Sequence, residues 1–166
     1  MASGLGTARG KGPLYRLYTA RLRRELTPEN MPHHIAMMID GNRRWARQLG
    51  YETAAHGHRA GAAKMREFLE WCDDLGVKVV SLYLLSTDNV RKRDAAELND
   101  LLQIIAELAE EISRVRDWRV KHVGRAELLH PELTRVLRAA EDRTAGNPGL
   151  HVNLAVCYGG RSEISS

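Results

Sequence analysis

One carboxylate and several arginines lie close together early in the chain, within I-A-M-M-I-D-G-N-R-R-W-A-R at residues 35–47. The carboxylate is Asp40, and the guanidinium groups belong to Arg43, Arg44 and Arg47. A carboxylate can hold Mg²⁺, while arginines bind phosphate oxygens in a forked geometry. The spacing therefore suggests a site for a metal-bridged phosphate or diphosphate. A solvated arginine-rich turn after a buried strand would give the same pattern.

The neighbouring elements would position this carboxylate. Residues 35–39 are apolar without alternation, which predicts a parallel-sheet strand that is buried on both faces. Asp40 would then lie at the carboxyl end of that strand, where open α/β sheets bind ligands. Gly41 permits a tight turn, and a helix after it would offer its first N–H groups and its positive dipole end to an anion.

Composition limits the class of protein. With 166 residues, 43% of them hydrophobic and 28% charged, the chain is long enough for one globular domain with a core. A net charge of +4 is too small to indicate nucleic-acid binding. We find no apolar run of bilayer length and no secretory signal. Cys72 and Cys157 lie in apolar segments, and two buried reduced thiols are typical of a cytoplasmic protein.

The first part of the chain predicts a tail and a helix. Residues 1–13 are rich in Gly, Ala and Ser, which predicts a disordered tail. Residues 14–26 carry leucines and Tyr18 at helical spacing together with four arginines, which predicts a basic amphipathic helix. Such a helix can lie on an anionic membrane surface, or it can pack on the domain with a solvated charged face, which we favour.

Residues 31–166 are predicted to form the rest of one α/β domain. Its elements alternate, which indicates a mostly parallel sheet flanked by helices. We expect a loop at 51–57, a C-cap at Gly76 and an N-cap at Asp94. The predicted strands are 35–39, 77–85, 119–123 and 150–156, and the predicted helices are 60–75, 95–116 and 131–144.

Three of these strands end in small or polar residues: D-G-N at 40–42, S-T-D-N at 86–89 and Y-G-G-R at 158–161. Right-handed crossovers bring the carboxyl ends of parallel strands to one edge of the sheet, so we expect a cleft there. The chain has no zinc-ligand spacing, no glycine-rich nucleotide fingerprint and no G-x-S-x-G nucleophile elbow.

Four segments together resemble the cis-prenyltransferases, the family of undecaprenyl diphosphate synthase and the short-chain Z-isoprenyl diphosphate synthases. They are D-G-N-R-R-W-A-R, the pair Gly57-His58, the strand end Y-L-L-S-T-D-N and the final Y-G-G-R-S-E-I. The resemblance implies a parallel sheet flanked by helices and a homodimer. It also implies Mg²⁺-dependent condensation of isopentenyl diphosphate with an allylic diphosphate, such as geranyl or farnesyl diphosphate, to give a cis double bond.

The resemblance implies roles for individual residues. Asp40 corresponds to the essential aspartate that works with Mg²⁺, and Asn89 to an asparagine that helps to remove the proton. Because neutral Asn89 is a poor base, we expect it to position a phosphate oxygen that takes the proton. The residues implied to bind substrate are Gly41, Asn42, Arg43, Arg44, Trp45, His58, Ser86, Thr87, Asp88, Val90 and Arg93.

Some correspondences stay open at this point. Arg93 and Glu97 match a family Arg/Glu pair if one residue is inserted after Asn89, but Lys92 competes for the arginine position. The two residues could also be a simple surface pair one helical turn apart. Val90 stands where many members have tryptophan, and this difference could alter the shape of the pocket and the length of the product.

The resemblance also implies a further segment beyond residue 166. In the family that segment carries an R-T-S/G-G-E-x-R-x-S motif, which binds isopentenyl diphosphate, and a glutamate that completes the Mg²⁺ site. We therefore expect the amino-terminal two-thirds of a cis-prenyltransferase domain that is truncated at its carboxyl terminus. The alternatives are a non-catalytic subunit that binds an allylic diphosphate or pairs with a complete partner, and a generic phosphate-ester hydrolase.

Overall fold

The computed structural model describes residues 12–27 and 29–159, and the chain divides into two compact units, residues 1–32 and 33–166. The predicted tail falls almost entirely outside the described residues, as do Gly160 and Arg161. Among the helices of the described part, none is both long enough and apolar enough to cross a bilayer.

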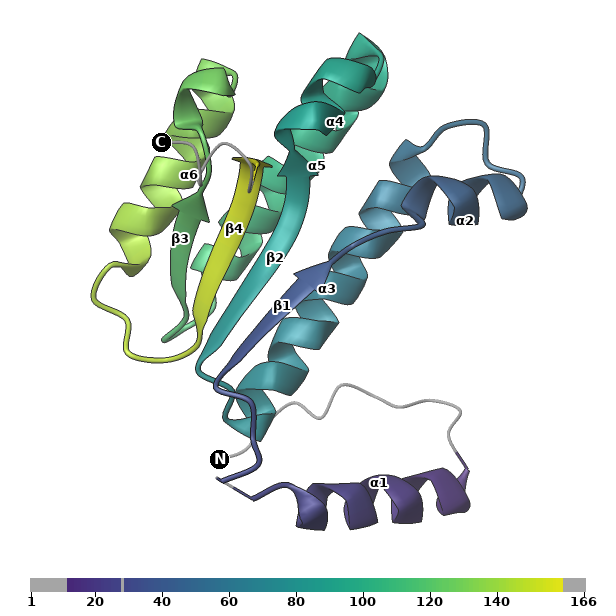
Figure 1. The fold of residues 1–166 in the computed structure, drawn as a ribbon, viewed down its shortest axis with the longest axis vertical. Helices are drawn as coiled ribbons and strands as arrows, with labels where there is room; N and C mark the ends of the chain where they lie inside the picture. The colour runs from purple at the N-terminus through teal and green to yellow at the C-terminus, as the bar shows by residue number, and fades with distance from the viewer. Residues whose placement is uncertain (1–11, 28, 160–166) are drawn as a thin grey trace. The chain divides into compact units, whose positions relative to one another are not determined.

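Among its described residues, the first unit contains the helix α1 (Pro13–Glu25), close to the predicted bounds (Figure 1). Proline at its first position suits a helix start, because the missing N–H would have no partner there. After the helix, the Asn30 amide donates to the Glu25 carbonyl at 2.7 Å, and the Thr27 N–H donates to Asn30 Oδ1 at 2.7 Å. None of the α1 residues is buried.

The second unit contains the parallel sheet that the sequence predicts, with strand order β1-β2-β4-β3 across its described residues. The strands are β1 (His34–Met38), β2 (Val79–Ser86), β3 (Arg119–Val123) and β4 (His151–Tyr158). The helices are α2 (Asn42–Gln48), α3 (Ala55–Leu75), α4 (Thr87–Lys92), α5 (Ala95–Ser113) and α6 (Pro131–Thr144), with a 3₁₀ turn at Ala126–Leu128.

The core lies between the sheet and three helices. Helices α3, α5 and α6 lie along the same side of the sheet, and α5 packs against both of the others (Figure 1). The central strands bury Val80, Leu82, Val152 and Leu154, each with no exposed surface, and the second half of β4 buries four successive residues, 154–157. The apolar stripe of α5 contributes to this core.

Strand β1 differs from its prediction. Its residues alternate between partly buried and exposed, with Ile35 and Met37 inward and Met38 76% exposed. Successive side chains on a strand point to opposite faces, and in the described chain only one face of this edge strand is covered by helices. The prediction of a strand buried on both faces was therefore wrong, because apolar residues by themselves do not reveal which face has a partner.

Helix boundaries also differ from the predictions at two places. Helix α3 begins at Ala55 rather than residue 60, so residues 55–57 lie in its first turn instead of in the predicted loop, and α5 ends at Ser113 instead of residue 116. The predicted caps are confirmed: Gly76 adopts φ 82°, and Asp94 Oδ1 accepts from the Glu97 N–H at 2.8 Å.

Both cysteines are free and buried, as predicted. Burial disfavours the thiolate and raises the pKa of Cys72 to about 11. These thiols are therefore packing groups rather than nucleophiles at neutral pH.

Candidate functional site

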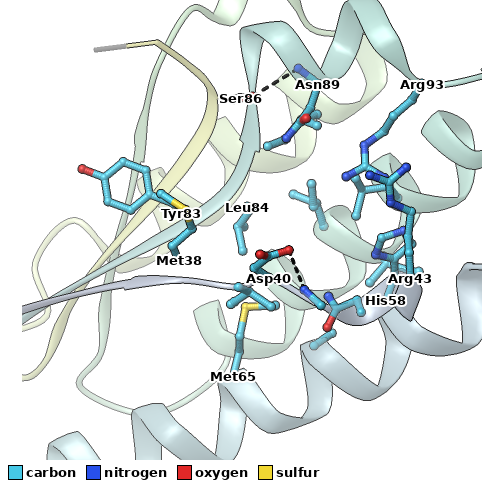
Figure 2. Close-up of a pocket in the computed structure, with 18 of the residues that line it drawn as sticks. Met38, Asp40, Arg43, His58, Met65, Tyr83, Leu84, Ser86, Asn89 and Arg93 are labelled. Atoms are coloured by element: carbon cyan, nitrogen blue, oxygen red, sulfur yellow. Dashed lines mark hydrogen bonds between the residues drawn. The ribbon is translucent and has the colours of Figure 1, made fainter. Parts of the chain in front are cut away.

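The ends of β1, β2 and β4 meet around a cavity of about 740 Å³, as the sequence predicts (Figure 2). Each strand contributes the residues that follow its carboxyl end, including Asp40, Ser86 and Gly159. Because the strands are parallel, three segments far apart in the chain converge at one edge of the sheet.

The turn between β1 and α2 brings Asp40 into the cavity. Gly41 adopts φ 91°, a left-handed conformation that residues with a Cβ rarely take, and it is the N-cap of α2. The Asp40 carboxylate is exposed, lies near the centre of the side chains in Figure 2, and accepts a hydrogen bond from the Gly41 N–H at 2.6 Å. It forms no ion pair with another residue of the described ranges.

Two glycines of α3 let α2 approach closely. A Cβ added at Gly57 would lie 2.1 Å from the Asn42 carbonyl oxygen, and one at Gly61 would lie 2.6 Å from Asn42 Nδ2. The two glycines lie one helical turn apart, so they form a single groove that holds Asn42. This packing fixes the start of α2, from which Arg43 and Arg44 reach the cavity.

A group of charged side chains lies on one side of the cavity (Figure 2). Glu97 Oε1 accepts a hydrogen bond from Arg93 Nη1, lies 3.2 Å from His58 Nε2 and lies 3.9 Å from Arg43 Nε. The Nε proton of His58 must therefore face the carboxylate. The Nε atom of Arg93 is buried and has no hydrogen-bond partner among the described residues.

The segment after β2 forms the short helix α4. Ser86 Oγ accepts from the Asn89 N–H at 3.1 Å and so caps α4 (Figure 2). Residues 86–89 all line the cavity.

Not every predicted site residue reaches the cavity. Trp45 and Val90 are absent from its lining, and the Trp45 ring instead lies 6.0 Å from the ring of Tyr51. Arg93 lines the cavity whereas Lys92 is exposed and does not, so the geometry favours Arg93 for the open arginine position. The remaining predicted residues, Asp40 to Arg44, His58, Ser86 to Asn89 and Arg93, are brought together.

The sequence analysis missed the apolar wall of the cavity. Its members are buried residues of α3 and α5: Met65, Leu101, Ile104, Ile105 and Leu108. Their helical spacing is typical of core positions, and the breadth of the apolar stripe on α5 was the available signal of an additional surface. A cavity with cationic groups at one edge and this wall beside them can hold an amphiphile with an anionic head.

Asp40 and Asp88 are the carboxylates that line the cavity, and the described residues contain no group of three or more side chains that could hold a metal ion. Mg²⁺ needs only one or two protein carboxylates when substrate phosphates and water supply the other oxygens. The donor set therefore fits Mg²⁺ that arrives with a diphosphate, and the exposed carboxylate of Asp40 is available to such an ion.

Comparison with known proteins identifies relatives of this chain. Residues 38–166 match the family model described as "Putative undecaprenyl diphosphate synthase". The chain is 48% identical to the short-chain Z-isoprenyl diphosphate synthase of Mycobacterium leprae over 157 residues, and 48% identical to the (2Z,6E)-farnesyl diphosphate synthase of Mycolicibacterium smegmatis over 158. These matches cover 93% of this chain and 60% of each relative, so the chain spans about three-fifths of their length.

A solved structure agrees with the fold. Lavandulyl diphosphate synthase from Lavandula x intermedia, crystallised with dimethylallyl diphosphate, superposes with a TM-score of 0.77 at 30% identity. The match covers 82% of this chain and 59% of that one. The sheet order, the motifs at the strand ends and the family match all lead to one conclusion: the chain belongs to the cis-prenyltransferase family, the family of undecaprenyl diphosphate synthase.

Proposed function

We propose that this chain carries the allylic-substrate half of a cis-prenyltransferase, which condenses isopentenyl diphosphate with an allylic diphosphate of the geranyl or farnesyl type. The observation that carries the proposal is the cavity, with arginines at its edge and buried aliphatic side chains on its wall. Two relatives at 48% identity are named as Z-isoprenyl and farnesyl diphosphate synthases, which supports the same substrate class.

The polar edge would stabilise the leaving group. Cleavage of the allylic carbon–oxygen bond leaves an allylic cation and a diphosphate anion. Arg43, Arg44 and Arg93 line the cavity where they can donate to diphosphate oxygens. Mg²⁺ bound with the diphosphate supplies additional positive charge to the departing oxygens. Helix α2 has only seven residues, so we assign the binding to these side chains rather than to its dipole.

The apolar wall would protect the cation. Met65, Ile104 and Leu108 provide a surface for the isoprenoid tail and limit the water that could trap the cation.

After carbon–carbon bond formation a proton must leave, and we propose that Asn89 orients the phosphate oxygen that accepts it. Asn89→Asp should then give no more than wild-type turnover, since a base at this position is not what the reaction needs. Turnover above wild type would contradict this role.

The direct test is incorporation of radiolabelled isopentenyl diphosphate onto geranyl or farnesyl diphosphate with Mg²⁺. We expect Asp40→Ala to abolish incorporation while the thermal unfolding midpoint stays within a few degrees, because the side chain is exposed. Unfolding of the variant would mean that Asp40 is a structural carboxylate. Allylic diphosphate binding without incorporation by the wild type would identify a binding subunit instead, and phosphate release without bond formation a hydrolase.

We also propose that the protein is a cytoplasmic homodimer. Because leucines of α1 are exposed, we propose for this helix the less favoured of the two roles considered from its sequence, contact with an anionic membrane surface. Leu14, Leu17 and Tyr18 are 81%, 69% and 59% exposed, and four arginines lie on the same helix. Flotation with vesicles that contain phosphatidylserine, but not with neutral vesicles, is the expected result. Leu17→Glu should reduce it, and equal flotation with both vesicle types would contradict the charge-based contact. Light scattering tests the dimer.

A further inference from the structure

One carboxylate outside the cavity lining touches three residues that line the cavity. Glu97 is not among the lining residues, its side chain is 15% exposed, and it lies on α5 behind the cavity edge. Its Oε1 atom accepts a hydrogen bond from Arg93, and it also lies near His58 and Arg43. The three partners belong to different elements: Arg93 is the C-cap of α4, His58 is in α3 and Arg43 is in α2. Figure 2 shows Arg43, His58 and Arg93 grouped on the same side of the pocket.

The three partners differ in how firmly they are held. Arg93 is 12% exposed and His58 is 5% exposed, so both are confined by packing as well as by Glu97. Arg43 is 57% exposed and its Nε lies 3.9 Å from the carboxylate, too far for a hydrogen bond. Glu97 therefore anchors Arg93 and His58 and leaves Arg43 free to reorient.

Arg93 keeps one donor unused in this arrangement. Its Nη1 donates to Glu97, but its buried Nε has no partner within residues 12–27 and 29–159. A buried donor without an acceptor is unfavourable, so other contacts must hold the guanidinium in this arrangement, and the bond to Glu97 is one of them. Because Arg93 lines the cavity, the Nη groups of its guanidinium are the donors that a phosphate oxygen there can meet.

We propose that Glu97 is a positioning residue: it holds the Arg93 guanidinium and the His58 ring in place so that the guanidinium meets a diphosphate oxygen in the cavity. This inference rests on the proposed function. Arginine loses considerable rotamer freedom when it binds a ligand. Fixing Arg93 before the ligand arrives removes that cost from binding, which is how preorganisation raises affinity.

A purely electrostatic role for Glu97 has the opposite consequence. A carboxylate near the cavity repels a diphosphate, so removing it should tighten binding if charge were its main contribution. Positioning predicts weaker binding on removal of the same group. The sign of the change in affinity therefore separates the two roles.

The test uses inorganic pyrophosphate with Mg²⁺ and isothermal titration of the full chain. We expect Glu97→Ala to weaken pyrophosphate binding about tenfold, and Glu97→Gln to weaken it less, because the amide oxygen still accepts from Arg93. The matched control is Glu107→Gln, which removes a charge from the same helix but pairs with Arg59 outside this cavity. The control should bind as the wild type does. Unchanged or tighter binding by Glu97→Ala would overturn the inference.

A second measurement needs no ligand. In the ¹H–¹⁵N spectrum, the Arg93 Nε–H signal can be assigned by its loss in Arg93→Lys. We expect a sharp signal at a distinct chemical shift in the wild type, and in Glu97→Ala a signal that moves to the average shift of mobile arginine side chains. An unchanged signal would show that packing alone holds Arg93 and would overturn the inference. If the wild type shows the sharp signal but does not bind pyrophosphate, the proposed function fails while the anchoring of Arg93 by Glu97 stands.

Discussion

The cavity has two sides that differ in burial and in chain composition. Its polar edge, residues 40–44, 86–89 and Arg93, comes from the turns and short helices after β1 and β2, and its charged residues other than Arg93 are exposed. Its apolar wall, formed by Met65, Leu101, Ile104, Ile105 and Leu108, belongs to two long helices and is buried.

Because of this difference, the residues that we propose to bind the diphosphate are largely different from the residues that stabilise the fold. Exposed polar groups contribute little to the free energy of unfolding, so the edge can carry reactive side chains at low structural cost. The wall residues belong both to the hydrophobic core and to the cavity, so any change there alters folding and pocket shape together. Substitutions at the edge should therefore affect affinity, and substitutions in the wall should affect stability.

The largest effect is expected in the wall. Ile105→Ala removes a side chain that is 2% exposed, which should lower the free energy of unfolding by about 2–5 kcal/mol. Urea denaturation followed by circular dichroism measures this change. Met38→Ala is the matched control, because Met38 lines the same cavity but is 76% exposed, and we expect a change within about 0.5 kcal/mol. Equal losses for the two variants would remove the distinction between edge and wall.

The next effect is expected where α2 meets α3. Gly57→Ala places a Cβ against the Asn42 backbone, which cannot move aside as a side-chain tip could, so we expect destabilisation of about 1–3 kcal/mol despite alanine's better helix propensity. Weaker pyrophosphate binding should accompany it, because Arg43 and Arg44 follow Asn42. Gly146→Ala is the control, since a Cβ there meets nothing within 4 Å. A Gly57→Ala variant as stable as wild type would show that the helices separate easily.

At the edge, we expect a loss of affinity without a loss of stability. Arg44→Ala should weaken binding of geranyl diphosphate about tenfold, the scale of one charge-assisted hydrogen bond, and should leave thermal unfolding nearly unchanged. Titration calorimetry and a thermal melt measure the two quantities. Arg66→Ala, which removes an exposed arginine of α3 outside this cavity, should change neither. If Arg44→Ala and Arg66→Ala bind alike, Arg44 does not contact the ligand.

The smallest effect is expected for Ser86, an edge residue that also caps a helix. Ser86→Ala removes the N-cap of α4 and should cost about 1 kcal/mol of unfolding free energy. Ser86→Thr keeps a hydroxyl acceptor and should recover most of that loss. Failure of threonine to recover it would mean that the cap is not what stabilises α4.

Much of this architecture was predictable from the chain alone. The strand 119–123 and the helix 131–144 have the predicted bounds, because their apolar periodicity and the proline at the helix start are local signals. The convergence of the three strand ends was also predictable, since the handedness of parallel crossovers leaves one arrangement. The bounds of α3 were not: its first turns contain Gly57, whose low helix propensity is offset by close packing on Asn42.

The order of the elements, the residues at the strand ends and the family depend on local pattern and motif, so the amino-acid chain alone predicts them. Three features required the folded molecule: the covered face of β1, the cavity wall formed by α3 and α5, and the contact of Glu97 with His58 across 39 residues of chain. Burial and pairing between distant segments arise from packing, and no local pattern records which partner a side chain will find.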